Sequence, residues 1–248
     1  MTLPEAYQSQ VQHIQPSPKF QPSDQSAEGQ IQATPFPGYT ILTPPGEEDE
    51  QNTPFYQYLK HYQQQITEQL DPGVFFPVPS SSFHMTLADL IWDSAYRHAS
   101  ESPTFEADLQ QRVAQSLQKC KQGEKPIHWQ VIGLFLRTRA IGVCLAPSDE
   151  ESYERVLQVR QAIYQNPDLI ALGIEQQYNF TAHVTLGYFG EAAATADRLQ
   201  ISQTLTSLSQ QTLDLDAPQE IWVHRAELRK FDDMTRYYRE PDWAALDL

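Results

Sequence analysis

Phe83-His84-Met85-Thr86-Leu87 recurs later in the chain as Ala182-His183-Val184-Thr185-Leu186. In each copy a histidine and a threonine lie two positions apart and alternate with apolar residues. Because successive side chains of a β-strand point to opposite faces, each copy predicts a strand with its apolar residues in a core and its His and Thr on the other face. Two such strands can bring two imidazoles and two hydroxyls to one cleft, a set that suits acid–base chemistry.

The order of predicted elements around the two motifs repeats as well. Each half runs strand, proline stop, helix, His-x-Thr strand, helix and strand, and the first strand of each half stops at Pro44 or Pro147. A duplicated lobe places equivalent strands about a pseudo-two-fold axis, so the histidine strands are expected to face each other across a groove. The sequence therefore predicts a bilobal α+β fold with two mainly antiparallel sheets, outer helices and an active cleft between the lobes.

Turn residues and apolar periodicity give the bounds of the other predicted elements. Strands are predicted at residues 39–43, 127–136, 140–146, 212–215 and 220–228, and helices at 53–70, 102–121, 148–164 and 195–209. Ser148 with Glu151 forms a predicted capping box, and Thr195 is the predicted cap of the last helix.

The first 38 residues differ from the rest of the chain. Gln, Pro and Ser dominate them, and they show almost no apolar periodicity. Such a segment buries too little apolar surface to offset the entropy of ordering it, so a flexible or loosely draped arm is expected. Residues 39–248 are predicted to form one bilobal domain.

Composition restricts the partners. The 248 residues are 40% hydrophobic and 20% charged, which is ordinary for a globular protein, and the formal net charge is -15. That charge weighs against binding of long nucleic acids, since their affinity comes mainly from lysine and arginine. A small phosphodiester or nucleotide ligand remains compatible. Five basic residues cluster near the C-terminus, and a solvated strand and turn explains them slightly better than a patch facing phosphate: Arg225, Arg229, Lys230, Arg236 and Arg239.

No apolar run approaches the roughly 20 residues of a membrane helix, and the N-terminus lacks the features of a signal peptide. Cys120 and Cys144 have neither a disulfide framework nor metal-ligand spacing. A cytoplasmic monomer with reduced thiols and no membrane contact is the expectation.

A single His-x-Thr motif is weak evidence, since a lone histidine is more often structural, but two motifs at matching places of a repeat favour a function. His84-Met85-Thr86-Leu87 and His183-Val184-Thr185-Leu186 resemble the paired His-x-Thr/Ser-x signatures of the 2H phosphoesterase superfamily. That superfamily includes bacterial RNA 2′,3′-cyclic phosphodiesterases, also called 2′-5′ RNA ligases, and nucleotide cyclic phosphodiesterases. The resemblance covers about residues 36–240. Residues 35–38 and Phe231-Asp232-Asp233-Met234 resemble an uncharacterised subgroup.

The resemblance implies a phosphodiesterase without metal or other cofactor that opens a 2′,3′-cyclic or related phosphodiester of a small nucleotide or RNA end. One neutral imidazole would take the proton of the attacking water and one imidazolium would protonate the leaving oxygen. Thr86 and Thr185 would donate hydrogen bonds to the non-bridging oxygens. The sequence leaves open which histidine is the acid, and whether the protein hydrolyses or ligates.

Two alternatives belong to other classes. One is a catalytically silent module on the same fold that binds a nucleotide or RNA end. The other is a metal site made by His84 and His183, which is disfavoured because each strand offers threonine rather than a second good ligand.

Four further residues are weaker candidates for substrate binding, and packing or simple exposure is an alternative for each. A regular strand would point Tyr188 away from His183, but a loop beginning near Gly187 would free its ring to stack on a base. Arg97 is expected in the loop after the first motif, where it could bind phosphate. Arg236 and Tyr237 could close over the cleft. Four other histidines have no counterpart in the repeat and are interpreted as structural or surface residues: His13, His61, His98 and His128.

Overall fold

The computed structural model of the chain describes residues 3–22, 31–123, 125–213 and 219–248. The helices are α1 (Leu3–Val11), α2 (Thr53–Gln69), α3 (Asp93–Ala99), α4 (Phe105–Leu117), α5 (Glu150–Tyr164), α6 (Pro167–Ile170) and α7 (Arg198–Leu213), with one-turn 3-10 helices at Glu50–Asn52, Ser80–Ser82 and Glu191–Ala194. The strands are β1 (Phe20–Pro22), β2 (Ile31–Ala33), β3 (Gly38–Leu42), β4 (Phe75–Pro77), β5 (Thr86–Trp92), β6 (Ile127–Leu136), β7 (Ala140–Pro147), β8 (His183–Phe189), β9 (Glu220–Val223), β10 (Arg225–Phe231), β11 (Tyr237–Tyr238) and β12 (Ala245–Asp247).

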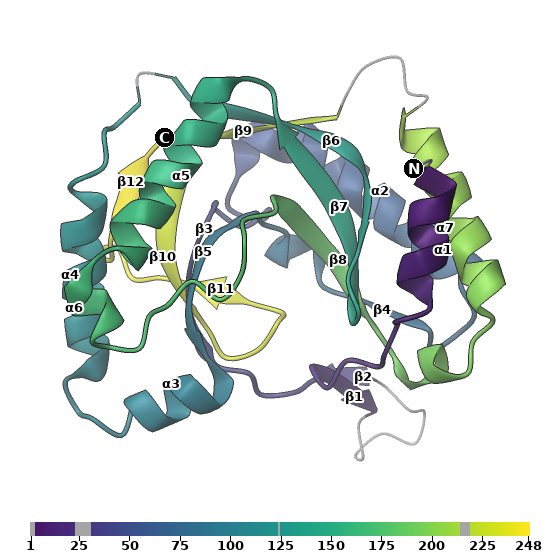
Figure 1. Cartoon of the computed structure of the whole chain (residues 1–248), viewed down its shortest axis with the longest axis horizontal. Coiled ribbons are helices and arrows are strands. Elements are labelled where there is room, and N and C mark those ends of the chain that lie inside the picture. The colour runs from purple at the N-terminus through teal and green to yellow at the C-terminus, as the bar shows by residue number, and fades with distance from the viewer. Residues whose placement is uncertain (1–2, 23–30, 124, 214–218) are drawn as a thin grey trace.

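Two five-stranded sheets form the centre of the molecule (Figure 1). The first sheet has the order β11-β10-β3-β5, with β12 also paired to β10, and the second has the order β4-β8-β7-β6-β9. All strand pairs in both sheets are antiparallel. Helices α4 and α5 lie outside the first sheet, and α1, α2 and α7 outside the second (Figure 1). The predicted α+β class with antiparallel sheets and outer helices is confirmed.

The two sequence halves interlock rather than forming one sheet each. Strand β6 ends the first half but lies in the second sheet, between β7 and β9. Strand β10 ends the second half but lies in the first sheet, beside β3. Helices also reach the other half's strands: α2 contacts β4 and β8 of the second sheet, while α5 contacts β5 of the first sheet as well as β6 and β7 of the second. Each sheet therefore depends on both halves of the repeat.

Amphipathic stripes explain why the long helices form where they do. In α2 the residues Phe55, Leu59, Tyr62 and Ile66 recur every three or four positions, and all are buried. Pro54 occupies the first turn of α2, where its missing N–H is harmless. Helix α4 carries a corresponding stripe, so both helices match the sequence-based expectation within a few residues.

The caps of two helices differ from expectation. Helix α5 is capped by Asp149, whose carboxylate accepts a hydrogen bond of 2.7 Å from the Ser152 amide, and not by Ser148. Helix α7 begins at Arg198 because the Asp197 carboxylate accepts from the amides of the first turn, while Thr195 follows a one-turn helix. In both places a carboxylate close to the expected hydroxyl is the N-cap acceptor.

The predicted strand at 220–228 is two strands in different sheets. Strand β9 pairs with β6, and β10 pairs with β3, so the chain changes sheet at His224. The predicted strand at 212–215 is also corrected, because residues 212 and 213 end α7; residues 214–218 lie outside the described part of the chain.

The N-terminal segment differs from the expected draped arm. Helix α1 packs along α7, and Val11 is fully buried. The Tyr7 hydroxyl donates a 2.9 Å hydrogen bond to the Leu134 carbonyl and lies 3.0 Å from the Ser209 hydroxyl. A few apolar side chains in a Gln-rich context suffice to dock this helix. Within the described residues, no helix is long and apolar enough to cross a membrane.

Candidate active site

The two motif strands meet at one antiparallel bridge between Met85 and Val184. These are the central residues of His84-x-Thr86 and His183-x-Thr185, and both are fully buried. Antiparallel register about the bridge sets His84 opposite Thr185 and Thr86 opposite His183. The four polar side chains therefore share the face opposite to Met85 and Val184, and the pseudo-two-fold axis of the repeat passes through the bridge.

The two imidazoles have the same backbone partner. Nδ1 of His84 lies 2.7 Å from the Ser82 carbonyl oxygen, and Nδ1 of His183 lies 2.7 Å from the Thr181 carbonyl oxygen. A carbonyl only accepts, so Nδ1 carries the proton and donates in both rings. The neutral rings then present the Nε2 lone pair, which is the atom that can take and give a proton.

Both imidazoles are less basic than an ordinary histidine. Burial lowers the pKa of His84 to about 4; the Ser82 hydrogen bond opposes this, and the charges of His183 and Arg229 add to it. Burial also lowers the pKa of His183, and Arg137 lowers it further, while the Thr181 hydrogen bond and the Asp89 carboxylate raise it. Both rings are thus neutral at pH 7 in the protein without ligand, and a bound anion would be needed to protonate one of them.

A cleft of about 440 Å³ opens beside the bridge, and Thr86, His183 and Thr185 line it. His84 lies against the ring of Tyr237, with 4.2 Å between ring centroids and an interplanar angle of 60°. Tyr237 itself lines the cleft, so its ring covers one side of His84. Three of the four motif residues therefore reach the cleft directly and the fourth borders it behind Tyr237.

A β-bulge in each motif strand turns a further residue into the cleft. The pairing of β7 with β8 passes from Gly187 to Thr185, and that of β3 with β5 passes from Ala88 to Thr86. One extra residue reverses the alternation of side chains beyond it. The residues five after the histidines, Asp89 and Tyr188, consequently line the cleft.

Tyr188 thus reaches the cleft through a bulge, and not through the loop that the sequence suggested. Asp89 is its equivalent in the first half, and regular alternation hid it from sequence reasoning. Its carboxylate accepts a hydrogen bond from the Tyr178 hydroxyl, and Tyr178 also lines the cleft. The signal that could have found Asp89 was the repeat itself, since Asp89 and Tyr188 hold the same position after their histidines.

The structure does not bring Arg97 or Arg236 to the cleft. Arg97 lies in helix α3 instead of a loop; it contacts Asp93 at 3.5 Å and the Pro35 carbonyl at 3.3 Å. Arg236 is exposed, and its guanidinium lies 5.8 Å from the centre of the Tyr238 ring. Neither arginine lines the cleft.

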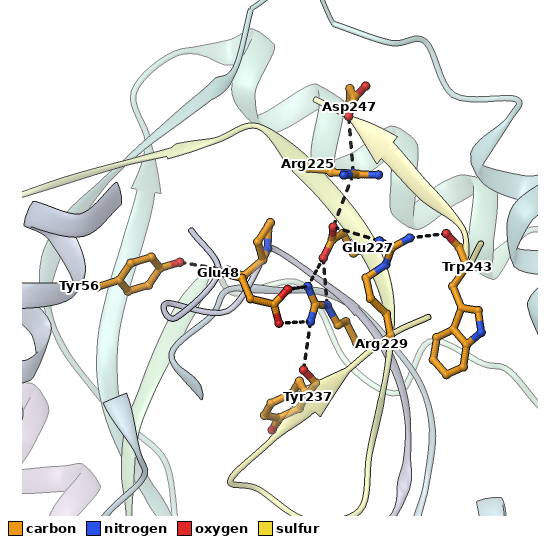
Figure 2. A network of polar contacts seen from close by, with 10 residues as sticks. Glu48, Tyr56, Arg225, Glu227, Arg229, Tyr237, Trp243 and Asp247 are labelled. Carbon is orange, nitrogen blue, oxygen red and sulfur yellow. Dashed lines mark hydrogen bonds and ion pairs between the residues drawn. The ribbon is translucent and has the colours of Figure 1, made fainter. Parts of the chain in front are cut away.

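Most of the basic cluster near the C-terminus pairs with acids inside the protein. Arg229 is almost fully buried, and its guanidinium contacts both oxygens of Glu48, at 2.6 and 2.7 Å, and Glu227 at 2.5 Å (Figure 2). It also donates a 3.1 Å hydrogen bond to the Tyr237 carbonyl. Arg229 thereby fixes β11, the strand that carries the ring covering His84. Lys230 forms an ion pair of 2.7 Å with Glu106.

Among the described residues, no group of three or more His, Cys, Asp or Glu side chains could hold a metal ion. His128 stacks on Trp222, with 4.0 Å between ring centroids, and lies 3.2 Å from Glu220. That environment agrees with a structural histidine.

Comparison with known proteins gives a family match for part of the chain and several similar solved structures. The family model 2H-phosphodiest, described as a domain of unknown function (DUF1868), matches residues 26–138. A conserved protein of unknown function from Agrobacterium tumefaciens has a similar structure: it is 18% identical, with a TM-score of 0.56 over 94% of this chain and 96% of that chain. A phosphoesterase is 16% identical, with a TM-score of 0.48 over 87% and 99% of the two chains. LigT of E. coli complexed with 3′-AMP is 15% identical, with a TM-score of 0.47 over 86% and 98%.

No curated protein matches the sequence. The family match contains the first motif and ends in the turn between β6 and β7, so it covers one half of the repeat. The second motif is joined to the first by the Met85–Val184 bridge. The resemblance to the 2H phosphoesterases is confirmed for residues 26–138, which match the domain model of that family.

Proposed function

We propose that the chain is a phosphodiesterase that opens a 2′,3′-cyclic or related phosphodiester of a small nucleotide or RNA end without a metal ion. The family match supports a phosphoesterase-type function. The observation that carries the proposal is the Met85–Val184 bridge, which sets the two His-x-Thr pairs head to tail on one face. The matched Nδ1 hydrogen bonds add to it, because they leave the Nε2 atoms of both imidazoles available for proton transfer.

The proposed reaction balances with these four residues alone. Water attacks phosphorus opposite the ester oxygen that leaves, and the Nε2 atom of one neutral imidazole accepts the proton of the water. The Nε2–H group of the other imidazole, protonated in the complex, donates its proton to the leaving oxygen. The Thr86 and Thr185 hydroxyls donate hydrogen bonds to the non-bridging oxygens, whose charge must be held during the transfer.

The neighbours of the two histidines favour one assignment of roles. Asp89 raises the pKa of His183, whereas Arg229 lowers the pKa of His84. His183 is therefore the ring more readily protonated when a phosphate anion enters, and it acts as the general acid. His84 stays neutral and acts as the general base.

The dimensions and chemistry of the cleft favour a small nucleotide. A volume of about 440 Å³ falls in the roughly 300–1,000 Å³ range of small-ligand sites. Trp92, Tyr178 and Tyr188 offer aromatic faces on which a base can stack. The net charge of -15 agrees with a small ligand held by local contacts rather than a long polyanion.

The test is hydrolysis of nucleoside 2′,3′-cyclic phosphates with a chelator present. We expect His84→Ala and His183→Ala each to lower kcat by roughly 10²- to 10⁴-fold, the range for loss of one general acid or base. His61→Ala, an exposed histidine on α2, is the matched control and should keep full activity. Full activity in either motif variant would remove that histidine from the mechanism.

One observation favours the second candidate, a silent binding module. The Tyr237 ring covers one side of His84, which would hinder transfer of a proton at that imidazole if the ring does not move. Saturable binding of nucleotides without any product from a panel of cyclic phosphates and 2′-5′ linked dinucleotides would support this alternative. Turnover of any member of the panel would exclude it.

A further inference from the structure

Lys19 belongs to the N-terminal segment, yet it lines the same cleft as His183 and the two motif threonines. The backbone around it is held on both sides. The Ser17 amide donates to the Phe189 carbonyl at 2.8 Å, and the Thr34 amide donates to the Lys19 carbonyl at 2.9 Å. Next to it, Phe20 packs on Tyr188 with 5.4 Å between ring centroids. The ammonium is therefore presented to the cleft by an anchored segment.

The ammonium is surrounded mostly by a thioether and aromatic rings. Nζ of Lys19 lies 3.2 Å from the Met234 sulfur, 4.3 Å from the centre of the Phe36 ring and 5.2 Å from that of Tyr188. In the part of the chain that the structure describes, no carboxylate forms an ion pair with it. Burial lowers its pKa to about 8, with Asp89 and Asp93 opposing the shift through their charges.

Lys230 provides an internal comparison. It also lies over two aromatic rings, 5.4 Å from the centre of Tyr39 and 5.6 Å from that of Tyr96. Unlike Lys19, it has a carboxylate partner, Glu106, at 2.7 Å, and its pKa is raised. A partly desolvated ammonium normally has such a partner, because an unpaired charge away from water is costly. Within the described part of the chain, Lys19 has no carboxylate in the position that Glu106 takes beside Lys230, and its ammonium faces the cleft instead.

From this arrangement we propose that Lys19 binds a second phosphate group of the ligand, so that the cleft takes a nucleotide with one phosphodiester at the imidazoles and another phosphate at the N-terminal segment. The inference rests on the proposed function for the first phosphate only. The phosphate would be the counter-ion that Lys19 lacks among the described residues, and the ammonium would donate a charge-assisted hydrogen bond to one of its oxygens.

Aromatic rings separate Lys19 from His84 in the cleft. Nζ of Lys19 lies 4.3 Å from the centre of the Phe36 ring, and Phe36 stacks on Phe231 with 6.5 Å between ring centroids. Phe231 in turn packs on Tyr237, with 5.3 Å between centroids, and Tyr237 is the ring that covers His84. The ammonium and the His84 imidazole therefore contact opposite ends of this series of rings, so a group bound at Lys19 is a different part of the ligand from the phosphorus at the imidazoles.

The experiment compares adenosine 2′,3′-cyclic phosphate with the same compound bearing a 5′-phosphate. For the unmodified protein we expect KM to be about tenfold lower or more for the 5′-phosphorylated compound, as for one hydrogen bond to a charged group. In Lys19→Met, which fills the same space without charge, the ratio of the two KM values should fall to about one. Lys19→Arg should restore part of the ratio. Lys60→Met, at an exposed lysine on α2, is the control and should keep it.

Equal KM values in the unmodified protein, or an equal change of both values in Lys19→Met, would overturn the proposal.

A second experiment tests the Lys19 site independently of the proposed phosphodiesterase function: binding of adenosine 3′-phosphate and of adenosine 3′,5′-bisphosphate is measured by calorimetry. If neither cyclic compound is turned over, the phosphodiesterase proposal fails. Tighter binding of the bisphosphate, lost in Lys19→Met, would still support the second site, and equal binding of the two would refute it. Thermal unfolding of Lys19→Met should occur no lower than in the unmodified protein, since the variant removes a partly buried charge.

Discussion

Two histidines with the same backbone contact differ in their electrostatic neighbours. Each donates from Nδ1 to the carbonyl two residues before it. The residue five positions after each histidine is a carboxylate in one half and a phenol in the other, Asp89 and Tyr188. Asp89 raises the pKa of the histidine of the opposite half, His183. The two halves thus place equivalent imidazoles in unlike electrostatic surroundings, because Asp89 raises the pKa of His183 whereas Arg229 lowers that of His84.

The pKa shifts predict an acidic optimum for kcat/KM, which reports the free protein. In the proposed mechanism, the active form has one charged and one neutral imidazole. Above the pKa of His183, which lies below 6.5, both rings become neutral; below the pKa of His84, about 4, both become charged. The rate should therefore peak between about pH 4 and pH 6.5. Initial rates across pH 3.5–9, about the range in which imidazoles titrate, measure it.

Asp89→Asn tests the cause of this profile. Removing the charge lowers the pKa of His183, so the alkaline limb should move to lower pH, while the amide oxygen can still accept from the Tyr178 hydroxyl. Asp93→Asn, at an exposed ion pair with Arg97, is the control and should leave the limb in place. A maximum above pH 7, or an alkaline limb that does not respond to Asp89, would contradict the assignment of His183 as the acid.

At the scale of elements, β10 carries a buried ionic network next to the site. Glu227 and Arg229 lie two apart on this strand, and Arg229 reaches Glu48 before α2 and the carbonyl of Tyr237 on β11 (Figure 2). One guanidinium therefore ties three segments together. The Glu48 contact lowers the pKa of that carboxyl, and the two acids raise the pKa of Arg229 against the effect of burial.

Arg229→Met should be strongly destabilising. It leaves Glu227 buried with only its longer contacts to Arg225 and Arg239, at 3.6 and 3.9 Å, and removes the donor to Tyr237. Loss of one partner of a buried pair costs about 3–5 kcal/mol, which urea denaturation can measure. It should also raise the pKa of His84, so the acid limb of the pH profile moves to higher pH.

Arg97→Met is the matched control, because it removes an arginine whose ion pair is exposed; a change of about 0.5 kcal/mol or less is expected. If Arg229→Met were as mild as Arg97→Met, the network would not be a structural support. An unchanged acid limb would show that Arg229 does not act on His84.

The elements also show how far the sequence could lead. The stripes of α2 and α4 and the His-x-Thr alternation were readable, because local periodicity records which face is buried. The bulges in β5 and β8 were not, since an extra leucine leaves the apolar pattern intact while reversing the side chains beyond it. The four motif residues could thus be placed on one face, whereas Asp89 and Lys19 reach the cleft through a bulge and a distant segment.

At the scale of the whole molecule, the repeat is interlocked. In the first half, from β3 to β6, strands β3 and β5 pair with each other, but among the described strands β6 pairs only with β7 and β9 of the second half. The segment from β7 onward leaves β10 without β3, its partner over five residue pairs. The site inherits this arrangement, because the bridge between Met85 and Val184 joins one strand from each half.

This topology predicts that a break between Thr138 and Arg139 yields two fragments that fold only together. The break lies in an exposed turn, so it removes no buried contact. Among the described residues, fragment 1–138 alone keeps the β1–β2 and β3–β5 pairs but leaves β4 and β6 unpaired, and its helices α2 and α4 lose their contacts with α7, β8 and α5. The other fragment keeps β7 with β8 and β10 with the short strands β11 and β12. Isolated pairs and short strands without their covering helices are marginally stable in water, so neither fragment should unfold cooperatively by circular dichroism. The equimolar mixture should recover a cooperative transition, because all strand neighbours in both sheets are restored.

Fragment 1–138 contains the whole family match, residues 26–138, so the result also decides whether that segment is an autonomous domain. A cooperative transition of fragment 1–138 alone would show that the first half folds without the strands it shares, and that the interlocked sheets form after folding of the halves.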